Sequence, residues 1–191
     1  MPSPQYDSST FPDFPFGHVL PPRVNPSLRD RQELLGCLSA AIYLASQIEL
    51  AEGSINLRVE PIKSIYFRAA LAELLRVEDI TKSYGRHFKF PATLNPLLHA
   101  IRLLRNYNVH IGSFKLEPGA RLVRWQGNEG VFHSFIADNI SATELRRLDS
   151  SALYTDAQLT ELVALFNTHQ RRFGVVQLLY NTTLHIASLI E

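Results

Sequence analysis

The sequence predicts an all-α fold, a bundle of about five helices into which a small β-hairpin is inserted at about residues 119–138. Two observations lead to this prediction. Apolar residues recur at helical spacing through most of the chain after residue 26, and several of these stretches begin with a capping signal. One stretch instead holds two short runs rich in branched and aromatic residues, ARLVRW and VFHSFIA, separated by QGNEG. We therefore expect one β-hairpin to interrupt the helical pattern.

The first 26 residues are expected to form an extended arm. They hold seven of the eleven prolines, and proline removes a backbone donor and disfavours helix. Aromatic residues interleave with these prolines, namely Tyr6, Phe11, Phe14 and Phe16. We therefore expect the arm, residues 1–26, to pack either on its own domain, which we favour, or on a neighbouring subunit. The remaining residues, 27–191, suffice for a single domain with its own core.

Two helices are predicted in the first half of that domain. The first begins near Ser27 and Asp30, which together fit a capping start, and continues to about Gly53. Its apolar positions recur at helical spacing: Leu34, Leu38, Ala41, Ala45 and Ile48. The second helix follows Glu60 as its cap, and Pro61 occupies its first turn, where proline is tolerated.

Capping signals also mark the later helices. Asn95 and Pro96 indicate the start of a third helix. After the hairpin, two capping boxes indicate further starts: Ser141 with Glu144, and Thr155 with Gln158. From Asp156 to about Ile190 the pattern stays helical, which is long for one straight helix, so we expect a break at Gly174.

Composition and charge are those of a globular chain. Hydrophobic residues make up 46% of the chain and charged residues 19%, which argues against disorder. The chain does not start with a basic segment and an apolar run, and it has no stretch of about 18 uninterrupted apolar residues. We therefore expect no secretory signal, no membrane span and a cytoplasmic location. The net charge of +1 is too small to indicate nucleic-acid binding by bulk electrostatics.

Cysteine and histidine usage does not point to a metal or a cofactor. Cys37 is the single cysteine, so it cannot form a disulfide within the chain. It lies among leucine and alanine positions of the first predicted helix, where we expect a small buried hydrophobe rather than a nucleophile. The seven histidines are dispersed, without an HExxH motif or a pair of histidines four residues apart. We expect no metal ion and no cofactor.

The stretch RNYNVH ends the third predicted helix with polar residues, Arg105, Asn106 and His110 among them. Arg105 shares a helical row with Leu98 and Ile101, so its guanidinium should have a partner or border a cleft, because an unpaired buried charge is costly. Asn106 and His110 are four residues apart and share a face. Arg105 lies about 140° from His110 around an ideal helix. A helix end or a second subunit must therefore bring the two together.

Arg105, Asn106 and His110 together resemble the R-x4-6-H motif of HEPN domains, which are helical bundles found in prokaryotic toxins, abortive-infection proteins and RNA-guided RNA nucleases. HEPN nucleases commonly carry a polar residue directly after the arginine, as Asn106 is here. The motif also falls at the end of a central helix with further helices behind it. The resemblance covers six residues of sequence and, in general topology, the helical domain 27–191.

The resemblance implies metal-independent cleavage of RNA, in phage defence or in a toxin–antitoxin pair. The ribose 2′-hydroxyl would attack the adjacent phosphate, leaving a 2′,3′-cyclic phosphate and a 5′-hydroxyl. His110 would take or give a proton, Arg105 would bind phosphate oxygens as charge develops on them, and Asn106 would orient one of the two. One histidine cannot be base and acid in the same step. HEPN ribonucleases usually dimerise for this reason, so a homodimer is implied.

The partners implied by the resemblance are RNA, a second copy of the chain, and an antitoxin or nucleotidyltransferase. Toxins that a nucleotidyltransferase silences by adenylylation carry a tyrosine two residues after the motif histidine. This chain has Gly112 at that position, which speaks against that form of control.

Four further residues are candidate RNA contacts: Arg86, His87, Lys89 and Arg102. The first three lie in YGRHFKF, a basic and aromatic mixture that single-stranded RNA can use. The same stretch also fits a plain loop anchored by its aromatic residues. For the whole chain, two alternatives to the nuclease stay open: a non-catalytic helical module that binds a protein or nucleotide, and an unrelated bundle in which Arg105 makes a structural salt bridge.

Overall fold

The computed structural model describes the chain apart from residues 1–3, 11–17, 19, 51–58, 126–127 and 139, and apart from the side chains of 59, 120–129 and 132. It confirms a mostly helical fold with a small β insertion. The helices are α1 Gln32–Leu50, α2 Val59–Ser83, α3 Pro96–His110, α4 Ala142–Arg146, α5 Asp156–Phe173 and α6 Val175–Ile190. The strands are β1 Leu116–Trp125 and β2 Asn128–Ala137, and short 3-10 turns include η1 Ser8–Thr10, η3 Phe90–Ala92 and η4 Asp149–Leu153.

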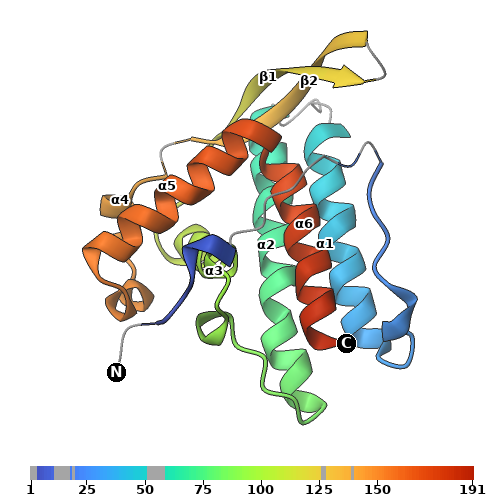
Figure 1. Ribbon diagram of the computed structural model, residues 1–191, viewed down its shortest axis with the longest axis vertical. Helices are drawn as coiled ribbons and strands as arrows, with labels where there is room; N and C mark the ends of the chain where they lie inside the picture. Colours follow the sequence, from blue (N-terminus) through green and yellow to red (C-terminus); the bar gives the residue numbers. More distant parts are fainter. Residues whose placement is uncertain (1–3, 11–17, 19, 51–58, 126–127, 139) are drawn as a thin grey trace.

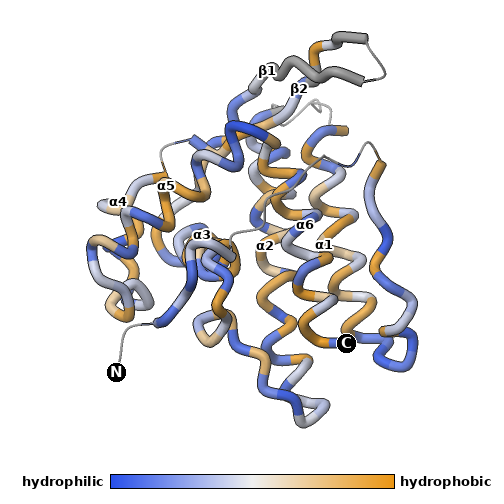
Figure 2. The backbone as a smooth tube through the Cα atoms, viewed as in Figure 1, coloured by the Kyte–Doolittle hydropathy of each residue, from blue (hydrophilic) through white to orange (hydrophobic). Residues whose placement is uncertain are grey.

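Three long helices form the main layer of the molecule. The helices α1, α2 and α6 lie side by side, and α3 packs on α2 and α5 at the centre (Figure 1). The faces that these helices turn toward one another are apolar, while the helix surfaces outside are more hydrophilic (Figure 2). The hairpin projects from one end of this layer, and α4 and α5 cover the side of α3 that faces away from α1. The C-terminal end of α3 therefore lies between the main layer and the α4–α5 segment.

The first helix starts later than predicted. Asn25 accepts a hydrogen bond from the backbone N–H of Ser27 and caps a 3-10 turn over Pro26–Leu28. Ser27 therefore lies inside this turn, where its hydroxyl donates to the Glu191 carboxylate at 2.8 Å, and it does not cap α1, which begins at Gln32. The predicted end of this helix at Gly53 lies outside the described residues.

Local capping signals identified the later helix starts correctly. Asn95 accepts a hydrogen bond from a first-turn amide of α3 at 2.9 Å, and Thr155 and Gln158 form a reciprocal capping box at the start of α5. At α4, the Ser141 hydroxyl accepts from the Glu144 amide at 3.2 Å, but the Glu144 carboxylate does not return to the cap. The Glu144 carboxylate instead accepts hydrogen bonds from Tyr107 and Arg147, which are described with the candidate site.

The hairpin is longer than predicted. The antiparallel register runs from Leu116 opposite Ala137 to Trp125 opposite Asn128, so the strands start before residue 119 and include most of the stretch predicted as a turn. Its tip, residues 126–127, lies outside the described residues.

A sharp bend separates α5 from α6, as predicted at Gly174. This residue has a φ of 83°, in the left-handed region that favours glycine, and the two helices meet at 112°. Buried glutamines flank the bend. Gln170 pairs with both backbone groups of Ala137 at 2.8 and 2.9 Å, and Gln177 pairs with those of His18 at 2.7 and 2.9 Å. The bend thereby holds the hairpin and the N-terminal segment on the bundle.

The described part of the N-terminal arm packs on its own domain. The Tyr6 ring lies 5.3 Å from the ring of His99, and its hydroxyl donates to the Gln158 carbonyl at 3.1 Å. The Asp7 amide donates to the Leu94 carbonyl at 2.9 Å. The arm therefore covers a polar part of the interior between α3 and α5.

The apolar helix α1 is long enough, by length and composition alone, to cross a membrane, and α5 with α6 passes the same test as a broken pair. In α1, 44% of the apolar window is buried inside the bundle. Core helices of soluble proteins share these features, so they are weak evidence for a membrane span.

Candidate functional site

The helix α3 carries the predicted motif and is regular from Pro96 to His110. Its core side is buried, and on another face Arg102, Asn106 and His110 follow one another at four-residue spacing. Arg102 and Asn106 are half-buried, and His110 is exposed. The polar face of α3 therefore runs from the interior of the molecule to its surface.

A cavity of about 350 Å³ lies at the surface end of this polar face. Two of the three motif residues, Asn106 and His110, line it together with Ile111 at the end of α3. The opposite wall comes from the segment that joins α4 to α5: Arg147, Leu148, Asp149 and Ser150. The cavity thus combines an imidazole, an amide, a hydroxyl, a guanidinium and a carboxylate.

Arg105 does not line this cavity but is connected to it through Asn106. Its Nη1 donates to the Asn106 side-chain oxygen at 3.2 Å, and the Asn106 amide nitrogen donates to the Ser150 hydroxyl at 3.1 Å. The Arg105 Nε is buried without a hydrogen-bond partner, and Arg105 forms no ion pair with any residue that the structure describes. The structure therefore offers no support for a structural salt bridge at Arg105.

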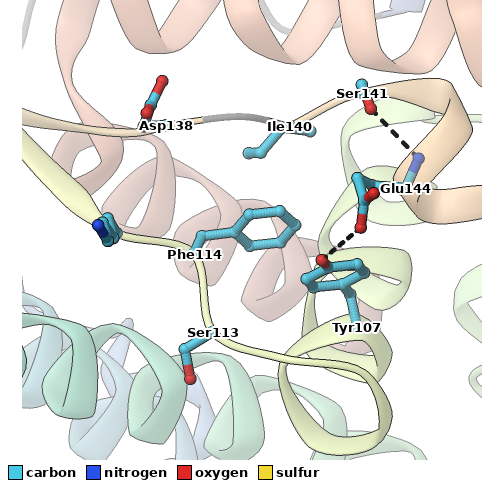
Figure 3. A pocket seen from close by; sticks show the side chains of 8 residues that line it. Tyr107, Ser113, Phe114, Asp138, Ile140, Ser141 and Glu144 are labelled. Atoms are coloured by element: carbon cyan, nitrogen blue, oxygen red, sulfur yellow. Dashed lines mark hydrogen bonds between the residues drawn. The ribbon is translucent and has the colours of Figure 1, made fainter.

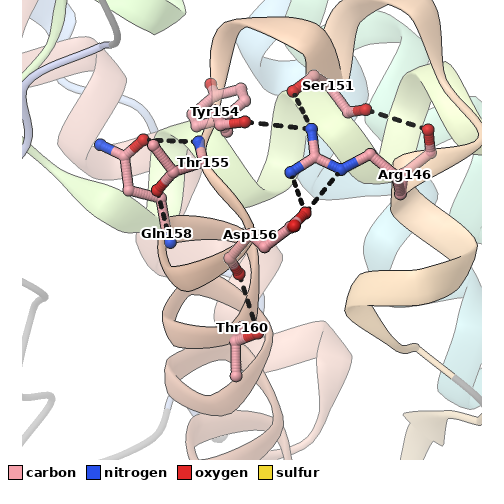
Figure 4. A network of polar contacts seen from close by, with 7 residues as sticks. All are labelled: Arg146, Ser151, Tyr154, Thr155, Asp156, Gln158 and Thr160. Atoms are coloured by element: carbon pink, nitrogen blue, oxygen red, sulfur yellow. Dashed lines mark hydrogen bonds and ion pairs between the residues drawn. The ribbon is translucent and has the colours of Figure 1, made fainter.

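The wall of the cavity formed by η4 is held by Arg146. Its guanidinium donates to the Asp156 carboxylate through Nε at 2.9 Å and through Nη2, and to the carbonyls of Ser151 and Tyr154 through Nη1 at 3.0 Å each (Figure 4). These bonds tie the end of α4, the η4 turn and the start of α5 into one unit. Ser150, whose hydroxyl accepts a hydrogen bond from Asn106 of α3, belongs to this unit.

A second polar cluster adjoins the last turn of α3 and shares Arg147 with the His110 cavity. The hydroxyl of Tyr107 and Nη1 of Arg147 both donate to the same oxygen of Glu144, each at 2.7 Å. The Tyr107 ring stacks on Phe114 at 4.4 Å, and both line a neighbouring cavity of about 620 Å³ with Ser141 (Figure 3). Because of the bonds from Tyr107 and Arg147, the pKa of the Glu144 carboxyl lies below its usual range. The hydrogen bond to Glu144 in turn raises the pKa of Tyr107.

Three of the predicted RNA contacts lie in the loop after α2, and two of these have structural contacts. Arg86 donates to the carbonyl of Ile190 at the end of α6 at 2.7 Å, and Lys89 lies 3.5 Å from the Glu78 carboxylate. His87 is exposed. The structure does not bring these three residues to the cavity that His110 lines.

Arg102, the fourth predicted RNA contact, lies deeper on the polar face of α3. Its guanidinium is close to the Tyr154 hydroxyl, and its Nη1 is buried without a hydrogen-bond partner. The hydroxyl of Tyr154 is also 2.9 Å from Nδ1 of the fully buried His99. Burial raises the pKa of Tyr154 to about 12, against the opposing effect of Arg102. Arg102 therefore belongs to a buried polar network beneath the cavity.

Three polar residues of the cavity were not predicted: Arg147, Asp149 and Ser150. They lie in RRLDSS, at the end of α4 and after it, and nothing in their local pattern distinguishes them from an ordinary helix end. The place of this segment beside α3 comes from tertiary packing, which single-sequence patterns do not encode. Among the described residues, no cluster of histidine, cysteine and acidic side chains is arranged to bind a metal ion.

No protein-family model, no curated protein and no solved structure matches this chain. A functional proposal therefore depends on the residues of the site themselves.

Proposed function

We propose that this protein is a metal-independent endoribonuclease of the HEPN type, acting as a homodimer on RNA at the cavity that His110 lines. The observation that supports it most directly is the joining of Arg105 to this cavity through Asn106. Arg105 and Asn106 are thus connected by a hydrogen bond, and Asn106 lines the same cavity as His110, although Arg105 and His110 lie on different sides of one helix.

The residue types at this site suit cleavage by transesterification. The 2′-oxygen of a ribose attacks the adjacent phosphorus and loses its proton to a histidine, while the bond from phosphorus to the 5′-oxygen breaks. The departing 5′-oxygen takes a proton from a second, protonated histidine, so the products are a 2′,3′-cyclic phosphate and a 5′-hydroxyl. Histidine side chains titrate near neutral pH and suit both roles. Guanidinium donors stabilise the charge that develops on the phosphate oxygens.

A second copy of the chain would supply what one cavity lacks. Each cavity has one histidine, His110, among its lining residues, and Arg105 does not reach it directly. Arg105 retains a buried Nε without a partner, as expected of a group that a ligand or a second subunit completes. Two cavities that face each other would provide two histidines to one phosphate.

The test compares RNA cleavage in EDTA by the wild type, by His110→Ala and by His133→Ala. His133 is also exposed but lies on β2, so it controls for the loss of a surface histidine. We expect the His110 variant to lose about 10²-fold or more of the rate and the His133 variant to keep it. Equal rates in all three proteins, or no cleavage by the wild type, would exclude the proposed activity.

A second candidate function is a non-catalytic module that binds a protein or a nucleotide at the same cavity. The charges of the site favour it, because Arg147 is paired with Glu144 and Asp149 adds a negative charge to the lining, which leaves little net positive charge for a polyanion such as RNA. Such a module would produce no cyclic-phosphate ends in the same assay.

A further inference from the structure

We propose that Arg147 is the residue that binds the substrate phosphate in the His110 cavity, and that Glu144 and Tyr107 fix the position of its guanidinium. This inference rests on the proposed function, because it names the cation of that same site. It assigns phosphate binding within one subunit to Arg147 rather than to the motif arginine, Arg105.

The position of Arg147 fits this role better than that of Arg105. Arg147 lines the cavity together with His110, Asn106 and Ser150, whereas Arg105 does not. The Arg147 side chain is 55% exposed, so its remaining donors are open to a ligand. A guanidinium carries five N–H donors in a planar fork, which suits two phosphate oxygens at once. One nitrogen of this fork, Nη1, is engaged by Glu144.

A buried aromatic residue anchors the ion pair that holds Arg147. The Tyr107 hydroxyl donates to Oε2 of Glu144 at 2.7 Å, and Arg147 Nη1 donates to the same oxygen at 2.7 Å. Tyr107 is 9% exposed, and its ring stacks on Phe114 with an angle of 18° between the planes. The Tyr107 hydroxyl and the Glu144 carboxylate point toward each other (Figure 3). This bond restrains the carboxylate, and the carboxylate in turn restrains the guanidinium of Arg147.

Two other arginines, Arg146 and Arg76, differ from Arg147 in the partners of their guanidinium groups. The guanidinium of Arg146, next in the chain, is taken up by Asp156 and two backbone carbonyls. Arg76 on α2 forms an ion pair with Glu73, three residues earlier, at 2.7 Å and is 53% exposed. This pair matches Arg147 and Glu144 in spacing, distance and exposure, but no described tyrosine donates to Glu73. Arg76 is therefore a closely matched control.

The first experiment measures binding of a single-stranded 2′-O-methyl RNA, which cannot be cleaved, across a range of salt concentrations. For Arg147→Ala we expect about fivefold or more weaker binding at low salt, and a log Kd versus log salt slope lower by about 0.7 for one lost phosphate contact. Arg147→Lys keeps the positive charge but lacks the planar fork, so its affinity should lie between those of the wild type and Arg147→Ala. Arg76→Ala should bind as the wild type does. Equal affinities and slopes for Arg147→Ala and Arg76→Ala would overturn the proposal.

The positioning role is tested with Tyr107→Phe, which removes the hydroxyl and keeps the stacked ring. If Tyr107 acts on RNA through Glu144 and Arg147, Tyr107→Phe as a single substitution weakens RNA binding. Added to Arg147→Ala, the same substitution then has no further effect. If the Tyr107 hydroxyl were only structural, its loss would weaken RNA binding equally in the wild type and in Arg147→Ala. That result would exclude the positioning role.

The outcomes also separate this inference from the proposed nuclease. If the wild type cleaves RNA, and Arg147→Ala cleaves and binds RNA as Arg76→Ala does, the proposed nuclease activity stands and the proposed role of Arg147 is rejected. Absence of cleavage, with RNA binding that depends on Arg147, rejects the nuclease and supports the phosphate site. Absence of any RNA binding rejects both.

Discussion

His99 of α3 is fully buried where the ends of η3 and η4 and the N-terminal arm meet. Its Nε2 lies 2.8 Å from the Thr93 carbonyl and must donate to it, which leaves Nδ1 to accept the Tyr154 hydroxyl at 2.9 Å. Both ring nitrogens of the neutral ring are thus paired. Burial lowers the pKa of His99, and the nearby Arg102 guanidinium acts in the same direction.

We predict that this buried histidine destabilises the fold in mild acid. Because the pKa of His99 in the fold lies below its unfolded value, the unfolded chain binds a proton first as the pH falls. Stability should therefore decrease below about pH 6.5, by up to about 1.4 kcal/mol per pH unit. His185, whose pKa burial also lowers, adds to this effect.

Chemical denaturation at about pH 7.5 and about pH 5.5 measures the effect. His99→Gln should be less stable than the wild type at the higher pH. When the pH is lowered to the second value, however, it should lose less stability than the wild type does. His133→Ala, at an exposed position, should keep the full wild-type difference. An unchanged pH difference in His99→Gln would show that His99 does not cause it.

A second prediction at the residue scale concerns the thiol of Cys37, which is 3% exposed and donates to the Glu73 carbonyl at 2.8 Å. Burial raises the pKa of this thiol to about 12, so almost none of it is the reactive thiolate near neutral pH. We expect a thiol reagent to label the native protein at least about 10²-fold more slowly than the unfolded chain. Rapid labelling of one thiol per native chain would contradict this burial.

At the scale of elements, the bend between α5 and α6 fixes the positions of several segments. Gly174 has a positive φ, and a Cβ atom there would lie 2.8 Å from Cβ of Ser134 on β2. The glycine thus serves two purposes, the left-handed backbone and the close approach of the hairpin. Gln170 and Gln177, on either side, bind the backbones of Ala137 and His18.

We therefore predict that Gly174→Ala destabilises the protein by about 2–4 kcal/mol, since it adds both backbone strain and overpacking. Gly36→Ala serves as the control, because Gly36 is exposed within α1 and nothing lies within 4 Å of its would-be Cβ. It should instead stabilise the protein by about 0.5–1 kcal/mol. Denaturant unfolding of both variants measures the difference, and similar effects in the two would refute the strained bend.

How far the sequence predicts these elements depends on the distance over which each interaction acts. Asn95 and Thr155 could be identified as caps because each binds an amide two or three residues away. The partners of Gln170 and Gln177 are 33 and 159 residues away, so nothing in the local pattern indicates their roles.

The same reasoning applies to the candidate site. The spacing of Arg105, Asn106 and His110 resembles a known motif and makes them candidates, and helix geometry indicated that Arg105 and His110 diverge, as they do on the regular helix α3. Arg147 was missed because its place beside His110 depends on how the α4–η4 segment packs on α3. Its local sequence indicates only a helix end.

At the scale of the whole molecule, a single chain brings one histidine, His110, to the lining of the candidate cavity. The proposed chemistry needs a base and an acid in the same step, so activity should belong to a dimer. We predict that the cleavage rate per chain falls on dilution, in step with the fraction of dimer measured by analytical ultracentrifugation. A rate per chain that stays constant while the protein becomes monomeric would show that one subunit suffices.

The central claim is that His110 and its cavity break RNA by attack of the ribose 2′-hydroxyl. Mass spectrometry of the ends produced from a defined RNA in EDTA tests this claim most directly. We expect 2′,3′-cyclic phosphate and 5′-hydroxyl ends from the wild type, and a loss of about 10²-fold or more of these ends with His110→Ala. Ends bearing a 3′-hydroxyl and a 5′-phosphate, the same ends in equal yield from the variant, or intact RNA throughout would contradict it.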